Sequence, residues 1–165
     1  MSNDDVQRRV QKIVSDVPSI QKRVGANEVR SLDRGPGAHA STNPSGRITV
    51  NSDWAKGVTD KRLQATLYHE SIHVDQFEQG MSGKKNLPIM EFHAHNRELR
   101  HAMKNDLYSP QDMQGKLAKI NKYGDKVKEK FPAFSDNVDR QLGRIEKGDM
   151  PAKHSVKYWT NKLGD

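Results

Sequence analysis

Hydrophobic residues recur every three or four positions along most of this chain, which is the pattern of amphipathic helices. Near the N-terminus, Val6, Val10 and Ile13 share one face of a predicted helix over residues 4–16 that ends before Pro18. This helix has no residue type that suggests chemistry, so we interpret its apolar face as a packing surface.

The helical spacing is lost between residues 25 and 53. Residues 28–32 and 47–51 are short runs typical of β-strands. The Gly-Pro-Gly of residues 35–37 and the Asn-Pro-Ser-Gly of residues 43–46 are typical of a loop between them. We therefore predict a small, irregular sheet.

Helical spacing returns at Thr59 or Asp60, either of which could cap a helix that stops at Gly80. The inward stripe of this helix is Leu63, Leu67, Glu70, Val74 and Phe77. A polar link then leads to Pro88, at the start of a second helix that runs to about Asp106.

Ser109 and Pro110 repeat the signal for a helix start, and the third long helix ends near Pro132. Shorter helices are predicted over residues 135–147 and 154–163. Together these elements predict an α+β fold that is mainly α. A small irregular sheet or edge strand would lie beside the first long helix, and the second long helix and the C-terminal helices would follow.

Composition favours a soluble protein with a thin core, because only 33% of residues are hydrophobic and the mean hydropathy is -0.96. No apolar run approaches the roughly 20 residues that span a bilayer. The N-terminus lacks the basic and apolar regions of a secretory signal peptide. We therefore expect no membrane span, and a protein that stays in the cytoplasm or is delivered by a non-classical secretion route.

The chain has no cysteine, which excludes disulfides, thiolate metal sites and cysteine nucleophiles. Any metal must be held by His, Asp or Glu. The net charge of +7 favours an acidic partner.

Residues 69–73 read His-Glu-Ser-Ile-His, within the helix predicted to begin near Thr59. Because residues four apart share one helical face, His69 and His73 can each present an imidazole nitrogen to one ion. Glu70 would lie beside the ion, where it can deprotonate an attacking water. Its place in the apolar stripe would desolvate the carboxylate and raise its pKa toward that of a useful base.

A His-Glu-x-x-His match arises by chance only about 0.01 times in a chain of this composition. We therefore favour a metal site over a helix whose two histidines hold no metal. A catalytic zinc site has three protein ligands and an open position, so one more ligand is needed.

The next helix supplies two candidates for the third ligand. Glu91 would complete a His-His-Glu site, and His95 lies one turn further along the same face, whereas His93 points to the other side. Spacing alone leaves both Glu91 and His95 open, and we favour Glu91.

Glu91-Phe92-His93-Ala94 forms an E-x-x-A sequence, and together with the motif at residues 69–73 it resembles the gluzincin metallopeptidases. The short interval between the two motifs, the edge-like strand at 47–51 and the small size are most similar to the minimal gluzincin domains. Those domains occur in bacterial polymorphic toxins and effectors and in peptidases that cleave repressors. The segment Tyr68–Gln76 looks like the form common in the toxin-associated group, and the resemblance covers residues 47 to about 103.

The resemblance implies a zincin-like fold and a zinc endopeptidase that acts on a protein or peptide substrate. His69, His73 and Glu91 would bind one Zn²⁺ ion, Glu70 would be the catalytic base, and strand 47–51 would bind the substrate backbone as an added strand.

The 165 residues fit one domain, which we predict to span 1–165. Within it, a catalytic core would cover about 47–107, and a basic helical part would cover about 108–165.

One position departs from the family pattern. Relatives often carry Asp four residues after the ligand Glu, where it orients a ligand imidazole, and here that position is His95. A neutral histidine would accept the same hydrogen bond more weakly. Asp75, Asn96 and Glu98 are the alternatives for this role.

The C-terminal part carries most of the net positive charge, with twelve Lys and Arg against seven Asp and Glu from Gln114 onward. Lysines at helical spacing predict a positive ridge opposite the apolar stripe. They are Lys116, Lys119, Lys122, Lys126 and Lys130. The ridge could dock an acidic inhibitor or immunity protein, although a solvated helix face is the simpler interpretation. Few aromatic residues are placed for base stacking, which disfavours nucleic acid as the partner.

Two other functions compete with the peptidase hypothesis. One is a basic binding module whose histidines hold a structural metal or none, and the other is a metal-dependent hydrolase of a non-peptide substrate. The motif and its helical context favour an enzyme over the binding module. They do not distinguish a peptide from another substrate.

Overall fold

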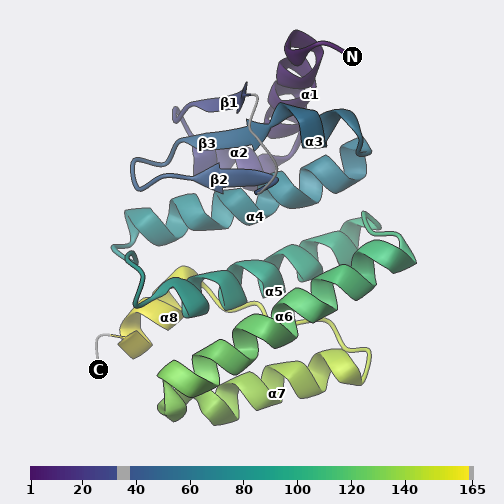
Figure 1. Ribbon diagram of the computed structural model, residues 1–165. Coiled ribbons are helices and arrows are strands. Elements are labelled where there is room, and N and C mark those ends of the chain that lie inside the picture. Colours follow the sequence, from purple (N-terminus) through teal and green to yellow (C-terminus); the bar gives the residue numbers. More distant parts are fainter. Residues whose placement is uncertain (33–37, 164–165) are drawn as a thin grey trace. The chain divides into compact units, whose positions relative to one another are not determined.

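The computed structural model describes residues 1–32 and 38–163, and it is mainly helical with one small sheet (Figure 1). The predicted α+β fold, mainly α, is therefore confirmed. The Gly-Pro-Gly loop predicted at 35–37 lies outside the described residues. The chain divides into two compact units, Met1–Glu78 and the part from residue 79 onward. A single catalytic domain over 1–165 stays a prediction.

The first unit contains four helices and three strands within its described residues. They are α1 (Asn3–Asp16), α2 (Pro18–Val24), β1 (Val29–Leu32), β2 (Ala40–Thr42), β3 (Ile48–Asn51), α3 (Ser52–Lys56) and α4 (Asp60–Glu78). Helices α1 and α4 and strands β1 and β3 match predicted elements. Helices α2 and α3 and strand β2 are additions, and each is at most seven residues long.

The sheet has the order β1-β3-β2, with β3 parallel to β1 and antiparallel to β2. Strand β3 is thus the central strand and has a neighbour on both sides, so the prediction of an edge strand at 47–51 is wrong. The edge strand that lies along α4 is β2 (Figure 1). It was missed because Ala40-Ser41-Thr42 is short and lacks the apolar alternation by which strands are recognised.

Helix α4 starts at a fixed point in the first unit. The Thr59 hydroxyl caps it by accepting a hydrogen bond from the Arg62 backbone N–H at 3.1 Å. The Arg9 guanidinium reaches across from α1 and donates to the Asp60 carboxylate at 2.7 Å and to the Val58 carbonyl at 2.9 Å. These contacts hold the first turn of α4 against α1. Of the two residues predicted as a cap, Thr59 is the one that caps the helix.

In the second unit, every regular element among the described residues is a helix or a helical turn. It consists of α5 (Leu87–Asn105), α6 (Pro110–Lys130), the 3-10 turn η1 (Pro132–Phe134), α7 (Ser135–Glu146) and α8 (Val156–Leu163). All four helices are where the sequence predicts them. Ser109 and Asp112 form a capping box at the start of α6, as the Ser-Pro signal indicated.

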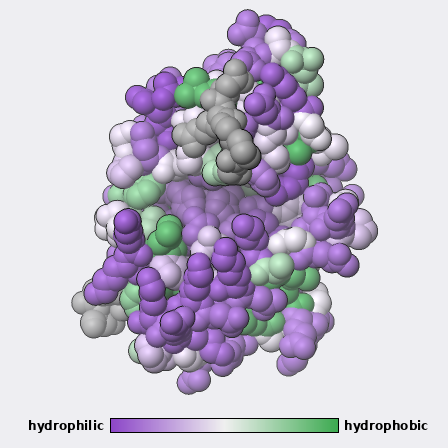
Figure 2. All heavy atoms as spheres, in the orientation of Figure 1, coloured by the Kyte–Doolittle hydropathy of each residue, from purple (hydrophilic) through white to green (hydrophobic). Residues whose placement is uncertain are grey.

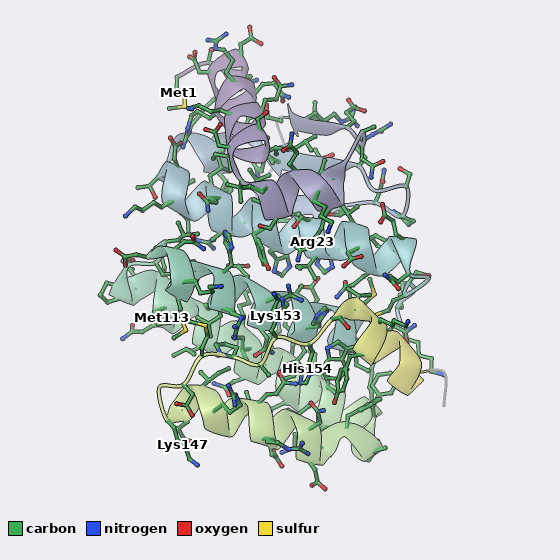
Figure 3. All side chains as sticks on the ribbon, turned by 180° about the vertical axis from the view of Figure 1, so that it is seen from behind. Met1, Arg23, Met113, Lys147, Lys153 and His154 are labelled. Atoms are coloured by element: carbon green, nitrogen blue, oxygen red, sulfur yellow. The ribbon has the colours of Figure 1, made fainter. Side chains whose placement is uncertain are left out.

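Residues 147–155 join α7 to α8 and run along α5 (Figure 3). From α5, Arg97 donates to the His154 carbonyl at 2.8 Å and Arg100 donates to the Pro151 carbonyl at 2.8 Å. Nε2 of His93 lies 3.0 Å from the same His154 carbonyl. These bonds hold the segment in place, and α8 then buries Trp159 in the core.

No helix in the described part of the chain combines the length and the apolar character needed to cross a membrane.

Gly124 allows α6 to approach its neighbours closely, because a Cβ at this position would lie 3.2 Å from side-chain atoms of both Phe92 and Val138. A Cβ at Gly115 in the same helix would meet nothing within 4 Å. We predict that Gly124→Val lowers the free energy of unfolding by about 1–3 kcal/mol through overpacking. Gly115→Val should change it by less than about 0.5 kcal/mol. Urea unfolding followed by circular dichroism measures both, and equal effects at the two glycines would contradict the close packing.

Candidate metal-binding site

Helix α4 carries a buried polar stripe in addition to its apolar one. Thr66, His69, His73 and Gln76 follow one another at intervals of three or four residues, and all four are buried. Because a buried polar group without a hydrogen bond costs about 1–3 kcal/mol, such a stripe persists only where its members have partners. The partners of these side chains therefore show what the stripe can do.

The imidazole rings of His69 and His73 converge on one point. Their Nε2 atoms are 3.0 Å apart, and the rings meet edge to face. Two nitrogens bound to one zinc ion in tetrahedral geometry would be about 3.3 Å apart, so this separation fits a shared ion after a small adjustment. The two histidines therefore share one face of α4, as the sequence indicated, and their binding of an ion stays a prediction.

Gln76 is a functional candidate that the sequence analysis missed. Its side-chain oxygen Oε1 lies 2.8 Å from Nδ1 of His73, and Gln76 is fully buried. A carbonyl oxygen only accepts hydrogen bonds, so Nδ1 of His73 must carry the proton and Nε2 must present its lone pair. His73 is thus held in the tautomer that a metal ligand requires. The spacing of three residues from His73 could have revealed this partner.

Glu70 is also buried, and strand β2 holds its carboxylate. The Thr42 hydroxyl donates to Oε2 of Glu70 at 2.6 Å. One ligand atom from each of His69, Glu70 and His73 can be chosen so that all lie within 4.8 Å of one another. This group could therefore hold a metal ion. Thr42 could not be found from the sequence, because its strand was interpreted as part of a loop.

Glu91 lies on α5 in the second unit, so its role as the third ligand stays a prediction. Within that unit its Oε2 is 3.3 Å from Nε2 of His95, the residue that competes with it for this role. The prediction that His93 points the other way is confirmed, since His93 contacts the carbonyl of His154.

The roles suggested for Asp75, Asn96 and Glu98 in orienting a ligand imidazole stay predictions. The side-chain amide of Asn96 donates to the Phe92 carbonyl at 2.7 Å, and the Glu98 carboxylate accepts from Lys116 at 2.8 Å. Asp75 is only half-buried, one position before Gln76 on α4.

The predicted lysine ridge on α6 is wrong at one position. Lys116 is buried, and its ammonium nitrogen lies 2.7 Å from Nδ1 of His95 on α5. The other four members of the ridge are exposed, and hydrophilic side chains dominate the face of α6 in Figure 2. They are Lys119, Lys122, Lys126 and Lys130. Lys116 breaks the pattern because an α5 carboxylate and imidazole solvate its charge in place of water.

No known family model matches this chain, and no curated protein or solved structure matches it either.

The contact between Gln76 and His73 leads to a test of metal binding. We predict that Gln76→Leu weakens the affinity for Zn²⁺ by about 10- to 100-fold, because His73 loses the acceptor that fixes its tautomer. Gln76→Glu should retain or increase the affinity, since a carboxylate is a stronger acceptor. Competition with a chromogenic chelator measures both variants. Exposed Gln79 provides the control, and a Gln79→Leu change as large as that of Gln76→Leu would contradict the assignment.

Proposed function

We propose that this protein is a zinc-dependent endopeptidase of the minimal gluzincin type. His69, His73 and Glu91 would hold one zinc ion, and Glu70 would act as the general base. The observation that carries the proposal is the convergence of the His69 and His73 Nε2 atoms at 3.0 Å, with Glu70 beside them.

The donor set fits zinc. Two imidazole nitrogens and one carboxylate oxygen form a common catalytic combination, and they leave a fourth position open for water or substrate. The fixed tautomer of His73 favours a bound cation, because Gln76 keeps the Nε2 lone pair directed toward His69. Zinc, when bound, supplies a Lewis acid that polarises the scissile carbonyl and lowers the pKa of water to about 7.

Glu70 follows a proposed ligand histidine directly in sequence, so its carboxylate would lie beside a bound ion, where it can act as a base. The Thr42 hydroxyl occupies Oε2 of Glu70, which leaves Oε1 to accept a proton from the attacking water. The same oxygen can then give this proton to the nitrogen of the leaving amine. Thr42 keeps the carboxylate oriented for both transfers.

The position of strand β2 favours a peptide as the substrate. It is an edge strand, and its Thr42 touches the proposed base, so an extended peptide that pairs with β2 would bring its backbone toward Glu70. This role was expected for residues 47–51, but β3 is enclosed by its neighbours. A toxin or effector role, with an acidic immunity protein as inhibitor, rests on the family resemblance and on the exposed lysines of α6.

The role of Glu70 is tested by Glu70→Gln. We predict that this variant loses about 10²- to 10⁴-fold in turnover while it keeps bound metal, because only the proton acceptor is removed. Mass spectrometry of a proteome-derived peptide library identifies cleavage, and elemental analysis measures metal. Glu78→Gln, at the exposed end of α4, is the matched control. Turnover by Glu70→Gln at the wild-type rate would exclude Glu70 as the base.

Metal-dependent hydrolysis of an ester or amide that is not a peptide, without peptide cleavage, would favour the non-peptide alternative.

The third ligand is tested by metal content. Glu91→Ala should lose most of its zinc when purified without chelator, whereas His95→Ala should retain a measurable fraction, because only the first removes a ligand atom. Elemental analysis of both variants beside the wild type gives the answer. Retained metal in Glu91→Ala together with loss in His95→Ala would overturn the assignment. Wild-type protein without stoichiometric metal would favour a binding module.

A further inference from the structure

Lys116 is a buried lysine in the helical second unit, and the proposed chemistry does not use it. Its side chain is only 6% exposed, and that of its partner Glu98 is 3% exposed. Lysine is almost never buried this far unless its charge is paired. A lysine kept in this environment therefore needs an explanation from the groups around it.

The ammonium of Lys116 has two acceptors on α5. It donates to Oε1 of Glu98 at 2.8 Å and to Nδ1 of His95 at 2.7 Å. An ammonium group can only donate hydrogen bonds, so Nδ1 of His95 must present its lone pair. If the imidazole were protonated, Nδ1 would also carry a proton, and two donors would face each other at 2.7 Å. The geometry therefore requires a neutral His95 with its proton on Nε2.

The proton on Nε2 of His95 faces Glu91. The distance from Nε2 to Oε2 of Glu91 is 3.3 Å, and the two residues are four apart on α5. The ring of Tyr123 on α6 stacks on His95 with a centroid separation of 5.4 Å and a tilt of 21°, which fixes the imidazole plane. Burial raises the pKa of Tyr123, and the negative charge of Glu91 adds to the rise. All of these contacts lie within α5 and α6.

We propose that Lys116 is a positioning residue for Glu91 and that it acts through His95. Lys116 selects the Nε2–H tautomer of His95, and His95 then donates to Oε2 of Glu91, which fixes the orientation of this carboxylate for a metal ion. This inference rests on the proposed role of Glu91 as the third zinc ligand. It also gives His95 a function that differs from coordination.

The charges of the cluster support this role. Glu98 neutralises Lys116, and a neutral His95 adds no charge, so neither Lys116 nor His95 cancels the negative charge of Glu91. Without Lys116, the Nδ1 side of His95 would face Glu98 without a cation between them. The ring could then turn toward either carboxylate, and Glu91 would lose its fixed hydrogen bond.

The experiment measures Zn²⁺ affinity by chelator competition and the state of His95 by ¹⁵N NMR of the metal-free protein. In the wild type, His95 should show a bare, hydrogen-bonded Nδ1 and a protonated Nε2. Lys116→Met keeps the stem and removes the donor, so it should lose this signature and bind Zn²⁺ about 10- to 100-fold more weakly. Lys116→Arg should restore part of the affinity, because it supplies new N–H donors.

Three further variants separate positioning from stability. Lys119→Met changes an exposed lysine one turn away on α6 and should leave both readouts unchanged. Lys116→Met combined with Glu98→Gln avoids an unpaired buried carboxylate, so it should fold and still lose affinity. Glu98→Gln alone keeps the Lys116 donor, and it should retain the His95 signature and most of the affinity.

Glu91→Ala, measured in parallel, separates the role of Lys116 from the identity of the metal ligands. If Glu91→Ala loses zinc while Lys116→Met keeps wild-type affinity and the wild-type His95 spectrum, the positioning role of Lys116 is wrong and the proposed ligand set stands. If Glu91→Ala keeps wild-type affinity, the ligand set itself fails. A wild-type spectrum with the proton on Nδ1 of His95 would overturn the inference without reference to metal.

Discussion

A buried imidazole has two ring nitrogens, and the group that satisfies one of them decides what the other can do. In α4 the amide oxygen of Gln76 accepts from Nδ1 of His73, which leaves a lone pair on Nε2. In α5 the ammonium of Lys116 donates to Nδ1 of His95, which leaves a proton on Nε2. Opposite partners thus give two buried histidines opposite capacities, one suited to a metal cation and the other to a carboxylate oxygen.

The long helices could be predicted because their signals are local. Apolar spacing, the Thr59 cap and the Ser109-Pro110 start are all contained within a few residues, and they gave α4 and α6 at the observed places. The sheet could not be predicted in the same way. Strand β2 exists because its backbone pairs with β3, which is a property of two distant segments and leaves little trace in Ala40-Ser41-Thr42.

The candidate site shows the same limit. The facing pair His69 and His73 follows from helical geometry alone, so the motif was sufficient to predict it. Gln76 has the same regular spacing, but amides are common on helices, and only its burial shows that its side chain pairs with His73. Thr42 and Lys116 reach their partners from other elements, and no spacing rule connects them to Glu70 or His95. Side chains that pair within one helix can therefore be predicted from their spacing, whereas partners that come from a neighbouring element cannot.

The segment between α7 and α8 is held by its backbone carbonyls. Arg97 and Arg100 of α5 bind the carbonyls of His154 and Pro151, and Arg144 of α7 binds that of Met150. Every residue type has a carbonyl, so these bonds do not depend on which side chains the segment carries. Most substitutions within residues 147–155 would thus keep these bonds, and the exception is Gly148, whose φ of 81° is a conformation that other residues rarely adopt. Helices α5 and α7 are where selection would act to keep the C-terminal end of the chain in place.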